Sequence, residues 1–300
     1  MPMNILITGA STGFGRRMAE ELALRGDRVY ATMRDINGRN AANRGELEAM
    51  AREKKLELHV LELDVTNQAS VDSAVAAALA DGGHLDVVVN NAGIAAIGVS
   101  EAYTPEQFEQ LYAINVFGVQ RVNRAVLPSM RKRRSGLLIH LSSAAGRVTV
   151  PAMAVYCSSK YALESIADGY RYELLPFGID SVLVEPGIYK TPIFDRLMNP
   201  ADAGTLASYG PSAEFADRVL GVFKGTIGGQ TDADADEVVT ATLQLIDTPM
   251  GNRPFRTVVS APVRPMLEPY NAAAEGLRPI VAQIFAVPEL AGAGEGSGVA

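Results

Sequence analysis

A tyrosine and a lysine four residues apart, Tyr156 and Lys160, form the most reactive pattern in this 300-residue sequence. If the segment is helical, both side chains project from the same face. A phenol has an unperturbed pKa of about 10 and is a poor base at neutral pH, but an adjacent ammonium favours the phenolate. A fall of about three pKa units corresponds to roughly 4 kcal/mol, and it would make Tyr156 a usable general acid or base. A lone pattern of this kind more often arises by chance on an exposed helix, so its surroundings decide its meaning.

A pair of serines precedes this pattern, at the end of the apolar run Leu137–Leu141, which reads as a strand. In open α/β sheets, ligands bind at the carboxyl ends of the strands. A serine hydroxyl there can donate a hydrogen bond to a substrate oxygen and stabilise negative charge that develops on it. Because side chains alternate along a strand, Ser142 and Ser143 are expected on opposite sides, and we favour Ser143.

A glycine-rich loop follows the first apolar run directly and opens the first helical segment. Glycines allow a tight turn and let backbone N–H groups approach a pyrophosphate, and the helix N-terminus adds roughly half a positive charge. The spacing is Gly-x-x-x-Gly-x-Gly, which differs from the Gly-x-Gly-x-x-Gly of the longer-chain dehydrogenases. The alternative is a glycine-rich turn that binds some other ligand, or none. The residues predicted to contact a dinucleotide here are Gly9, Ser11, Thr12, Gly13, Phe14 and Gly15.

The end of the second apolar run indicates which dinucleotide is bound. An acidic residue about 20 positions after the loop normally holds the adenosine ribose 2′-hydroxyl. Here Met33 is followed by Arg34, and a guanidinium pairs with a 2′-phosphate that a carboxylate would repel. The sequence therefore favours NADP(H), with NAD(H) as the second choice. Asp35 is adjacent, and a solvated loop charge at Arg34 is the alternative.

Two further strand ends carry candidate ligand contacts. An aspartate after the third strand would accept a hydrogen bond from the adenine amino group, or would cap a turn. Small residues after the fourth strand let the backbone lie close to a flat ligand, although such a turn alone is weak support. These candidates are Asp64 and Val65 in the first place, and Asn91, Ala92 and Gly93 in the second.

The composition excludes several classes of protein. Hydrophobic residues make up 48% of the chain and charged residues 20%, which argues against disorder. A net charge of −7 disfavours nonspecific binding to nucleic acid or to anionic membranes. The single cysteine, Cys157, excludes an internal disulfide and a thiolate zinc site, and the three histidines show no metal-ligand spacing. No apolar run has the length of a membrane span and the start resembles no signal peptide, so we expect a soluble, cytoplasmic protein without a metal.

The elements that must position these residues alternate between apolar runs and helical patterns. Helical periodicity lies between the runs, for example over Arg17–Leu24 and Val71–Leu79. This alternation predicts an α/β fold: one doubly wound, Rossmann-type parallel sheet with helices on both faces, in a single domain over residues 1–290. Residues 189–229, rich in proline and glycine, predict a helical insertion that covers the substrate, and residues 291–300 a flexible tail. The predicted strands are Asn4–Thr8, Arg28–Thr32, Leu58–Leu63, Leu85–Val89, Leu137–Leu141, Ile179–Val184 and Arg256–Val259.

Taken in order, these motifs resemble the short-chain dehydrogenase/reductase family from Ile5 to about Val259. The resemblance rests on the glycine loop, Asp64, the Asn90–Gly93 turn, Asn115, Ser143, the Tyr156/Lys160 pair and Pro186-Gly187. It implies a catalytic tetrad of Asn115, Ser143, Tyr156 and Lys160, although a buried Asn115 on a long amphipathic helix could be a structural hydrogen-bonding residue. It further implies that Tyr156 and Lys160 contact the cofactor, and that Lys160 hydrogen-bonds its nicotinamide ribose. The nicotinamide end would also contact Pro186, Gly187, Ile188 and Thr191.

Within that family, the segments around Arg34, Tyr156 and Tyr172 resemble the hydroxysteroid and retinol dehydrogenase branch, in which Arg34 matches the position that selects NADP(H). We therefore expect an NADP(H)-dependent oxidoreductase that transfers a hydride between the nicotinamide and a carbonyl or secondary alcohol of a fairly apolar substrate. The alternatives are an NAD-linked alcohol dehydrogenase that works oxidatively, a non-catalytic dinucleotide sensor, and a sugar-nucleotide epimerase or dehydratase. The resemblance also implies a homodimer or homotetramer built through the helices that carry Asn115 and Tyr156.

Overall fold

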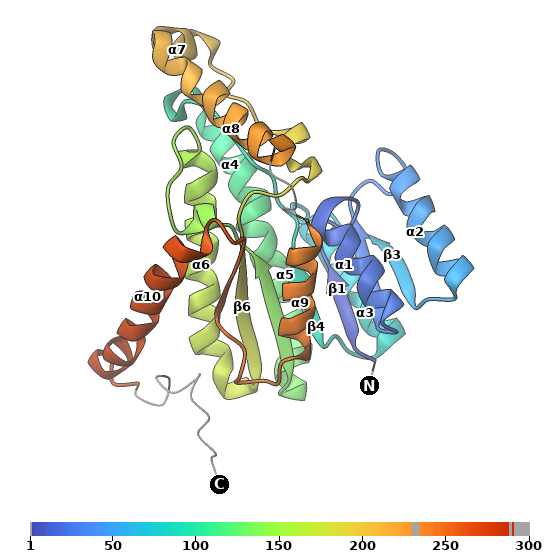
Figure 1. Cartoon of the computed structure of the whole chain (residues 1–300). Coiled ribbons are helices and arrows are strands. Elements are labelled where there is room, and N and C mark those ends of the chain that lie inside the picture. Colours follow the sequence, from blue (N-terminus) through green and yellow to red (C-terminus); the bar gives the residue numbers. More distant parts are fainter. Residues whose placement is uncertain (1, 230–233, 288–289, 291–300) are drawn as a thin grey trace.

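The computed structural model describes residues 2–229, 234–287 and 290, and it contains one seven-stranded parallel sheet (Figure 1). The spatial order of the strands is β3-β2-β1-β4-β5-β6-β7. The strands are β1 (Asn4–Ile7), β2 (Arg28–Met33), β3 (Leu58–Glu62), β4 (Val87–Asn90), β5 (Gly136–Leu141), β6 (Ile179–Pro186) and β7 (Arg256–Val259). All seven predicted strands are confirmed, with ends that differ by one or two residues at most.

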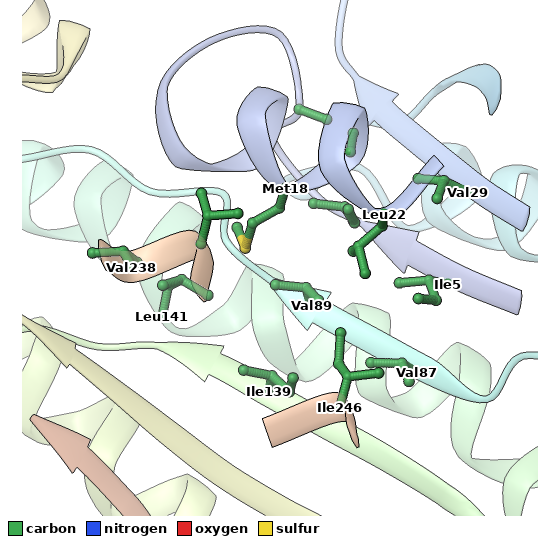
Figure 2. Close-up of a cluster of buried hydrophobic side chains, with 14 of the residues drawn as sticks. Ile5, Met18, Leu22, Val29, Val87, Val89, Ile139, Leu141, Val238 and Ile246 are labelled. Carbon is green, nitrogen blue, oxygen red and sulfur yellow. The ribbon is translucent and has the colours of Figure 1, made fainter. Parts of the chain in front are cut away.

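The strands alternate apolar side chains between two cores because both faces of the sheet are covered by helices. On one face, Ile5 and Ile7 of β1 pack with Met18 and Leu22 of α1 (Gly13–Leu24) and with α9 (Asp236–Asp247) (Figure 2). On the other face, Leu6 packs with residues of α3 (Gln68–Gly82), α5 (Phe117–Arg133) and α6 (Ala154–Leu174). The doubly wound fold is therefore confirmed.

The order of the strands fixes where a ligand can bind. The chain leaves β1 toward β2 and β3 on one side, and returns on the other side through β4 to β7. Open α/β sheets bind ligands in the crevice where the strand order reverses, here beyond the carboxyl ends of β1 and β4. The glycine loop follows β1 and the Asn90–Gly93 turn follows β4, so the topology brings them together.

The segment that the sequence predicts to be a helical insertion lies beyond the same strand ends (top of Figure 1). It contains the 3-10 turns Pro192–Arg196 and Gly210–Glu214 and the helices α7 (Ala203–Ser208) and α8 (Phe215–Gly229). Its helical character is confirmed, and α8, with 15 residues, is longer than the short helices expected. The remaining helices are α2 (Ala41–Lys54), α4 (Pro105–Asn115) and α10 (Arg264–Ile284), the last lying beside α6.

Two sequence predictions concern parts of the chain or properties that the fold does not test. The predicted tail, residues 291–300, lies outside the described residues. The single-domain boundary at residue 290 stays a prediction.

Within the described ranges, no helix combines the length and apolar character that crossing a bilayer requires. The same ranges bring together no group of three or more His, Cys, Asp or Glu side chains that could hold a metal ion.

Candidate active site

A cavity of about 760 Å³ lies at the carboxyl ends of the strands. This volume is typical of a site for a small molecule or cofactor. Nearly all of the predicted site residues line it, and the two exceptions are Gly15 and Asn115. Those that line it are Gly9, Ser11, Thr12, Gly13, Phe14, Arg34, Asp64, Val65, Asn91, Ala92, Gly93, Ser143, Tyr156, Lys160, Pro186, Gly187, Ile188 and Thr191.

The glycine loop is tied to the end of β4 by a compact set of hydrogen bonds. Thr8 Oγ1 accepts from the backbone N–H groups of Asn91 and Ala92, each at 3.0 Å. The Asn91 side-chain amide donates in return to Thr8 O at 2.8 Å and Gly9 O at 3.1 Å. Gly9 has φ +68°, and a Cβ added to it would lie 2.9 Å from Ala92 Cα. The two loops are therefore held as one rigid cradle, in which only glycine fits at position 9.

The start of α1 opens this cradle toward the cavity. Thr12 occupies the N-cap but makes no side-chain cap hydrogen bond, so its side chain leaves the first N–H groups of the helix without this partner. Gly13, with φ +62°, would place a Cβ beside Thr191 and Pro192 across the cavity. Gly15 faces the loop interior, where a Cβ would clash with Gly9 O at 2.6 Å. This loop fits a pyrophosphate, which needs close backbone approach and donors at a helix N-terminus.

The loop after β2 presents two guanidinium groups to the far end of the cavity. Arg34 and Arg39 both line the cavity, and neither forms an ion pair with a described residue. Asp35 instead turns into its own loop: its φ is +52°, and its carboxylate accepts from the Arg39 backbone N–H at 2.9 Å. Sequence reasoning missed Arg39. The available signal was the turn-forming stretch Asp35-Ile-Asn-Gly38, which brings the next residue back beside Arg34.

Asp64 lines the cavity and also caps a turn. Its Oδ1 accepts from the backbone N–H of Thr66 at 2.9 Å and from the Thr66 hydroxyl at 2.7 Å. Asp64 therefore caps a turn, and its second carboxylate oxygen can still accept a hydrogen bond from a ligand. Its contact with an adenine amino group stays a prediction.

Tyr156 is buried in the cavity wall, with 7% of its surface exposed. Burial raises the pKa of Tyr156 to about 12, and a side-chain hydrogen bond with Ser143 acts in the opposite direction. Lys160 Nζ lies 5.9 Å from the centroid of the Tyr156 ring and donates to Leu141 O at 2.7 Å. Desolvation of the phenolate is the largest influence on the Tyr156 pKa in this structure, and the lowering of that pKa by Lys160 stays a prediction.

Lys160 is itself almost fully buried, which lowers its pKa to about 8. The pKa values of Tyr156 and Lys160 are thus both displaced from their usual values because both side chains are buried in a pocket of low dielectric constant. Such displacements mark functional sites more often than structural ones.

The two serines after β5 take different directions, as strand alternation predicts. Ser143 caps the short 3-10 turn Ala144–Gly146, where its Oγ accepts from the Ala145 N–H at 3.1 Å, and its hydroxyl acts to lower the pKa of Tyr156. Ser142 Oγ is buried and lies where a Cβ on Gly146 would meet it at 2.8 Å. Ser143 is therefore the hydroxyl beside the tyrosine.

Asn115 lies behind the cavity instead of in its lining. Its Oδ1 accepts from Ile94 N at 2.9 Å, and its Nδ2 donates to Ile94 O and to Ser159 Oγ, each at 3.0 Å. The long helix expected here is interrupted: α4 ends at Asn115, and α5 begins at Phe117. Both N–H groups of the amide and one lone pair of Oδ1 are thus used in fixing the chain after β4, and a catalytic role for Asn115 stays a prediction. A Cβ on Gly93 would lie 3.4 Å from Asn115 Oδ1 and 3.8 Å from Lys160 Nζ, so the two residues flank Gly93.

The remaining part of the cavity, beyond Tyr156 and Ser143, is mostly apolar. The helical insertion contributes Phe194 and Phe223, whose ring centroids lie 5.5 Å apart. The start of α10 contributes Met266 and Leu267, which sequence reasoning had not assigned. The other apolar side chains of this part are Ile114, Val148, Val150, Met153, Ile188, Ile193, Met198 and Val263.

Comparison with known proteins gives a consistent assignment. The family model described as short chain dehydrogenase matches residues 3–201. An uncharacterized oxidoreductase of Bacillus subtilis, YusZ, is 40% identical over 209 residues, which span 68% of this chain and 73% of the relative. Retinol dehydrogenase 8 of Bos taurus is 31% identical over 259 residues, which span 84% of this chain and 81% of the relative.

Solved structures with the same fold include dinucleotide complexes. A short-chain dehydrogenase from Sphingobium yanoikuyae in complex with NADPH has a TM-score of 0.69 and 26% identity, and the match covers 92% of this chain and 95% of that one. A 3-ketoacyl-(acyl-carrier-protein) reductase from Brucella melitensis complexed with NADH has a TM-score of 0.57 and 29% identity, covering 70% of this chain and 91% of that one.

Proposed function

Because this chain belongs to the short-chain dehydrogenase family of oxidoreductases, we propose that it interconverts a carbonyl and a secondary alcohol on a fairly apolar substrate, with NADP(H) as cofactor. The observation that carries the proposal is the meeting of Tyr156 and Ser143 at the boundary between the cradle and the apolar half of the cavity. The cofactor, when bound, supplies or accepts the hydride.

The chain's own residues account for binding and for the proton. The cradle of Gly9, Gly13 and the start of α1 binds the pyrophosphate. Ser143 donates to the substrate oxygen and holds it against the Tyr156 hydroxyl, which gives up its proton as the carbonyl is reduced. The high pKa of Tyr156 suits this direction, since the phenol is fully protonated at neutral pH. In the reverse direction the phenolate must form, and the buried ammonium of Lys160 is the positive charge that favours it.

The apolar half of the cavity supports the proposed substrate class. Phe194, Phe223, Met153 and Met198 offer dispersion contacts and no charge to a bound molecule. The printed name of the bovine relative, retinol dehydrogenase, refers to an apolar alcohol, which agrees with this assignment. A panel of ketones and secondary alcohols of increasing apolar size, followed by NADPH absorbance, tests it. Preference for small polar substrates would contradict it.

The role of Tyr156 is tested by Tyr156→Phe, which keeps the ring and removes the hydroxyl. We expect turnover to fall by about 10²- to 10⁴-fold, the usual contribution of a general acid, while NADPH affinity measured by fluorescence is unchanged. Tyr161→Phe is the matched control: Tyr161 lies on the same helix, 38% exposed, and its hydroxyl donates to Arg147 O. Retained turnover in Tyr156→Phe would disprove the assignment.

The preference for NADP(H) is supported by the pair Arg34 and Arg39, for which the described residues supply no acidic partner, and by the withdrawal of Asp35 into its loop. A guanidinium–phosphate hydrogen bond is worth about 1.5–3 kcal/mol, so Arg34→Asp and Arg39→Gln should each lower the NADPH-to-NADH affinity ratio by roughly 10- to 100-fold. Arg44→Gln is the control, because Arg44 lies on α2 paired with Glu48. An unchanged ratio in both variants would favour the NAD-linked alternative.

We also propose that the protein forms a homodimer or homotetramer through α4, α5 and α6. On α5, Phe117 is 50% exposed and its ring contacts that of Tyr112, with ring centroids 6.4 Å apart. An aromatic side chain exposed to this extent on a helix surface is a typical interface residue. Light scattering of the wild type and of Phe117→Glu tests this arrangement. A monomeric wild type would contradict it.

A further inference from the structure

Lys160 lies at one end of a buried group of charges that extends away from the cavity. Glu164 follows it by one turn on the same face of α6 and is 2% exposed. Glu164 Oε2 accepts from Arg256 Nε on β7 at 2.8 Å. The proposed mechanism assigns no role to Glu164 or Arg256.

A second carboxyl faces the same arginine. Glu185, on β6, is fully buried, and its Oε1 lies 3.6 Å from Arg256 Nε, while Asn271 of α10 donates to its Oε2 at 2.7 Å. Burial, reinforced by the charge of Glu164, raises the pKa of Glu185 to about 7. Glu164 has the shorter contact with Arg256, at 2.8 Å against 3.6 Å for Glu185, and the raised pKa of Glu185 means that this carboxyl holds its proton more readily than an exposed glutamate does.

The position of Glu164 is fixed from the active-site side as well. A Cβ on Gly146 would lie 3.1 Å from Glu164 Cγ and 2.8 Å from Ser142 Oγ, so the carboxylate packs against the turn that Ser143 caps. Glu164 Oε1 is buried and has no hydrogen-bond partner in the described part of the chain. A buried carboxylate in this situation is costly unless a nearby positive charge compensates it.

Lys160 is the positively charged group on the active-site side of Glu164. Its ammonium donates to Leu141 O, and the described residues provide it with no direct ion pair. Burial lowers its pKa to about 8, and the charge of Glu164 is the influence that opposes burial. The imidazole of His140, behind Lys160 on β5, stays neutral because burial lowers its pKa to about 3. Other titratable or charged groups packed around this set are Arg147, Tyr156, Asp168, Arg171, Glu275 and Arg278.

We propose that Glu164 is a positioning residue of this enzyme: its carboxylate, anchored by Arg256, is the counter-charge that keeps Lys160 in the ammonium form. The inference rests on the proposed function for its catalytic consequence, since Tyr156 needs that ammonium. The electrostatic relation between Glu164 and Lys160 holds without any substrate or cofactor.

The direct test is the titration of Lys160, measured on protein with carbon-13-labelled lysine without cofactor. The signal is assigned through the Lys160→Met variant. Glu164→Gln keeps the size of the side chain and removes its charge, and we expect the midpoint for Lys160 to fall by roughly one pH unit or more. Glu164→Asp keeps the charge but withdraws it by one methylene, so a smaller fall is expected.

Glu275→Gln is the matched control. Glu275 lies 3.6 Å from the same arginine but on α10 at the outer edge of the group, and its removal should leave the titration of Lys160 unmoved. An unchanged midpoint in both Glu164 variants would overturn the proposal. So would an equal fall in Glu275→Gln, because the effect would then be a general one of the cluster. If Glu164→Gln does not fold, Glu164→Asp still decides.

A kinetic readout separates this proposal from the proposed function. In Glu164→Gln, the pH above which turnover declines should move downward by the same interval as the Lys160 midpoint, while turnover near pH 6 is retained within a few-fold. A merely structural role would lower turnover at every pH without moving the profile, and would contradict the proposal. Absence of carbonyl reduction by the wild type would refute the proposed function alone, because the lysine titration does not depend on turnover.

Discussion

The buried carboxyl of Glu185 gives the protein a pH-dependent stability that can be worked out from the structure. Its pKa is raised from 4.5 to about 7 in the folded protein. Because the folded-state pKa lies above the unfolded-state value, Glu185 contributes stability that is fully present below about pH 4.5 and is lost as the pH rises through about 7. Glu185→Gln mimics the protonated acid at every pH and should remove this dependence.

The magnitude follows from the two pKa values. The full shift of about 2.5 pKa units corresponds to roughly 3 kcal/mol at 1.36 kcal/mol per unit. Most of it is lost between about pH 5 and about pH 8.5, so over this interval the wild type should lose roughly 2–3 kcal/mol of unfolding free energy relative to Glu185→Gln. Glu185 is fully buried, so solvent screening does not reduce this value.

Urea unfolding of both proteins at these two pH values measures the effect, with refolding traces to confirm reversibility. Taking the difference between the proteins cancels the contributions of the titrating groups that do not interact with Glu185, so the difference reports the interacting pair Glu185 and Glu164. The unfolding free energy of Glu185→Gln should increase relative to that of the wild type as the pH rises. If the difference in unfolding free energy between the two proteins is constant with pH, or changes in the opposite direction, the raised pKa of Glu185 is refuted.

Three further outcomes are expected. Gly9→Ala should lower stability by roughly 1–3 kcal/mol and weaken NADPH binding, since its φ is +68° and its Cβ would meet Ala92; calorimetry and fluorescence titration measure both. Thr8→Val leaves the N–H groups of Asn91 and Ala92 without their acceptor, which should cost about 1–3 kcal/mol by urea unfolding. Burial raises the pKa of the Cys157 thiol, so a thiol reagent should react only at the rate of unfolding.

The strands were predictable because both faces of a parallel sheet are buried, which makes each strand a continuous apolar run. Arg256–Val259 has the same limits in the sequence analysis and in the structure. For the helical insertion, the sequence predicted the helical character but not the length of α8, which has 15 residues. Its elements are positioned by contacts between distant residues, such as that between Phe194 and Phe223, which no local pattern records.

In the site, motif order was enough to bring Ser143, Tyr156 and Lys160 together, because strand ends meet at one edge of the sheet. The direction of the tyrosine pKa was not predictable, since it depends on the depth of burial. The contact between Glu164 and Arg256 was also not predictable from the sequence. It joins positions 92 residues apart through the pairing of β6 with β7, and charged residues seldom show in sequence that they are buried.

The loop between β2 and α2 has a consequence for engineering. Asp35 accepts from Arg39 N, and the Asn40 side chain donates to Arg34 O at 2.6 Å, so the turn is closed by its own residues. The loop also has contacts outside it, since Ile36 packs against the core of the sheet and Arg44 donates to Asn37 Oδ1 at 2.8 Å. An exchange of residues 34–40 between relatives of different cofactor choice must therefore keep an apolar side chain at position 36 and include Arg44. Such an exchange transfers Arg34 and Arg39 together with the loop backbone that orients their guanidinium groups. A single substitution of either arginine leaves that backbone unchanged.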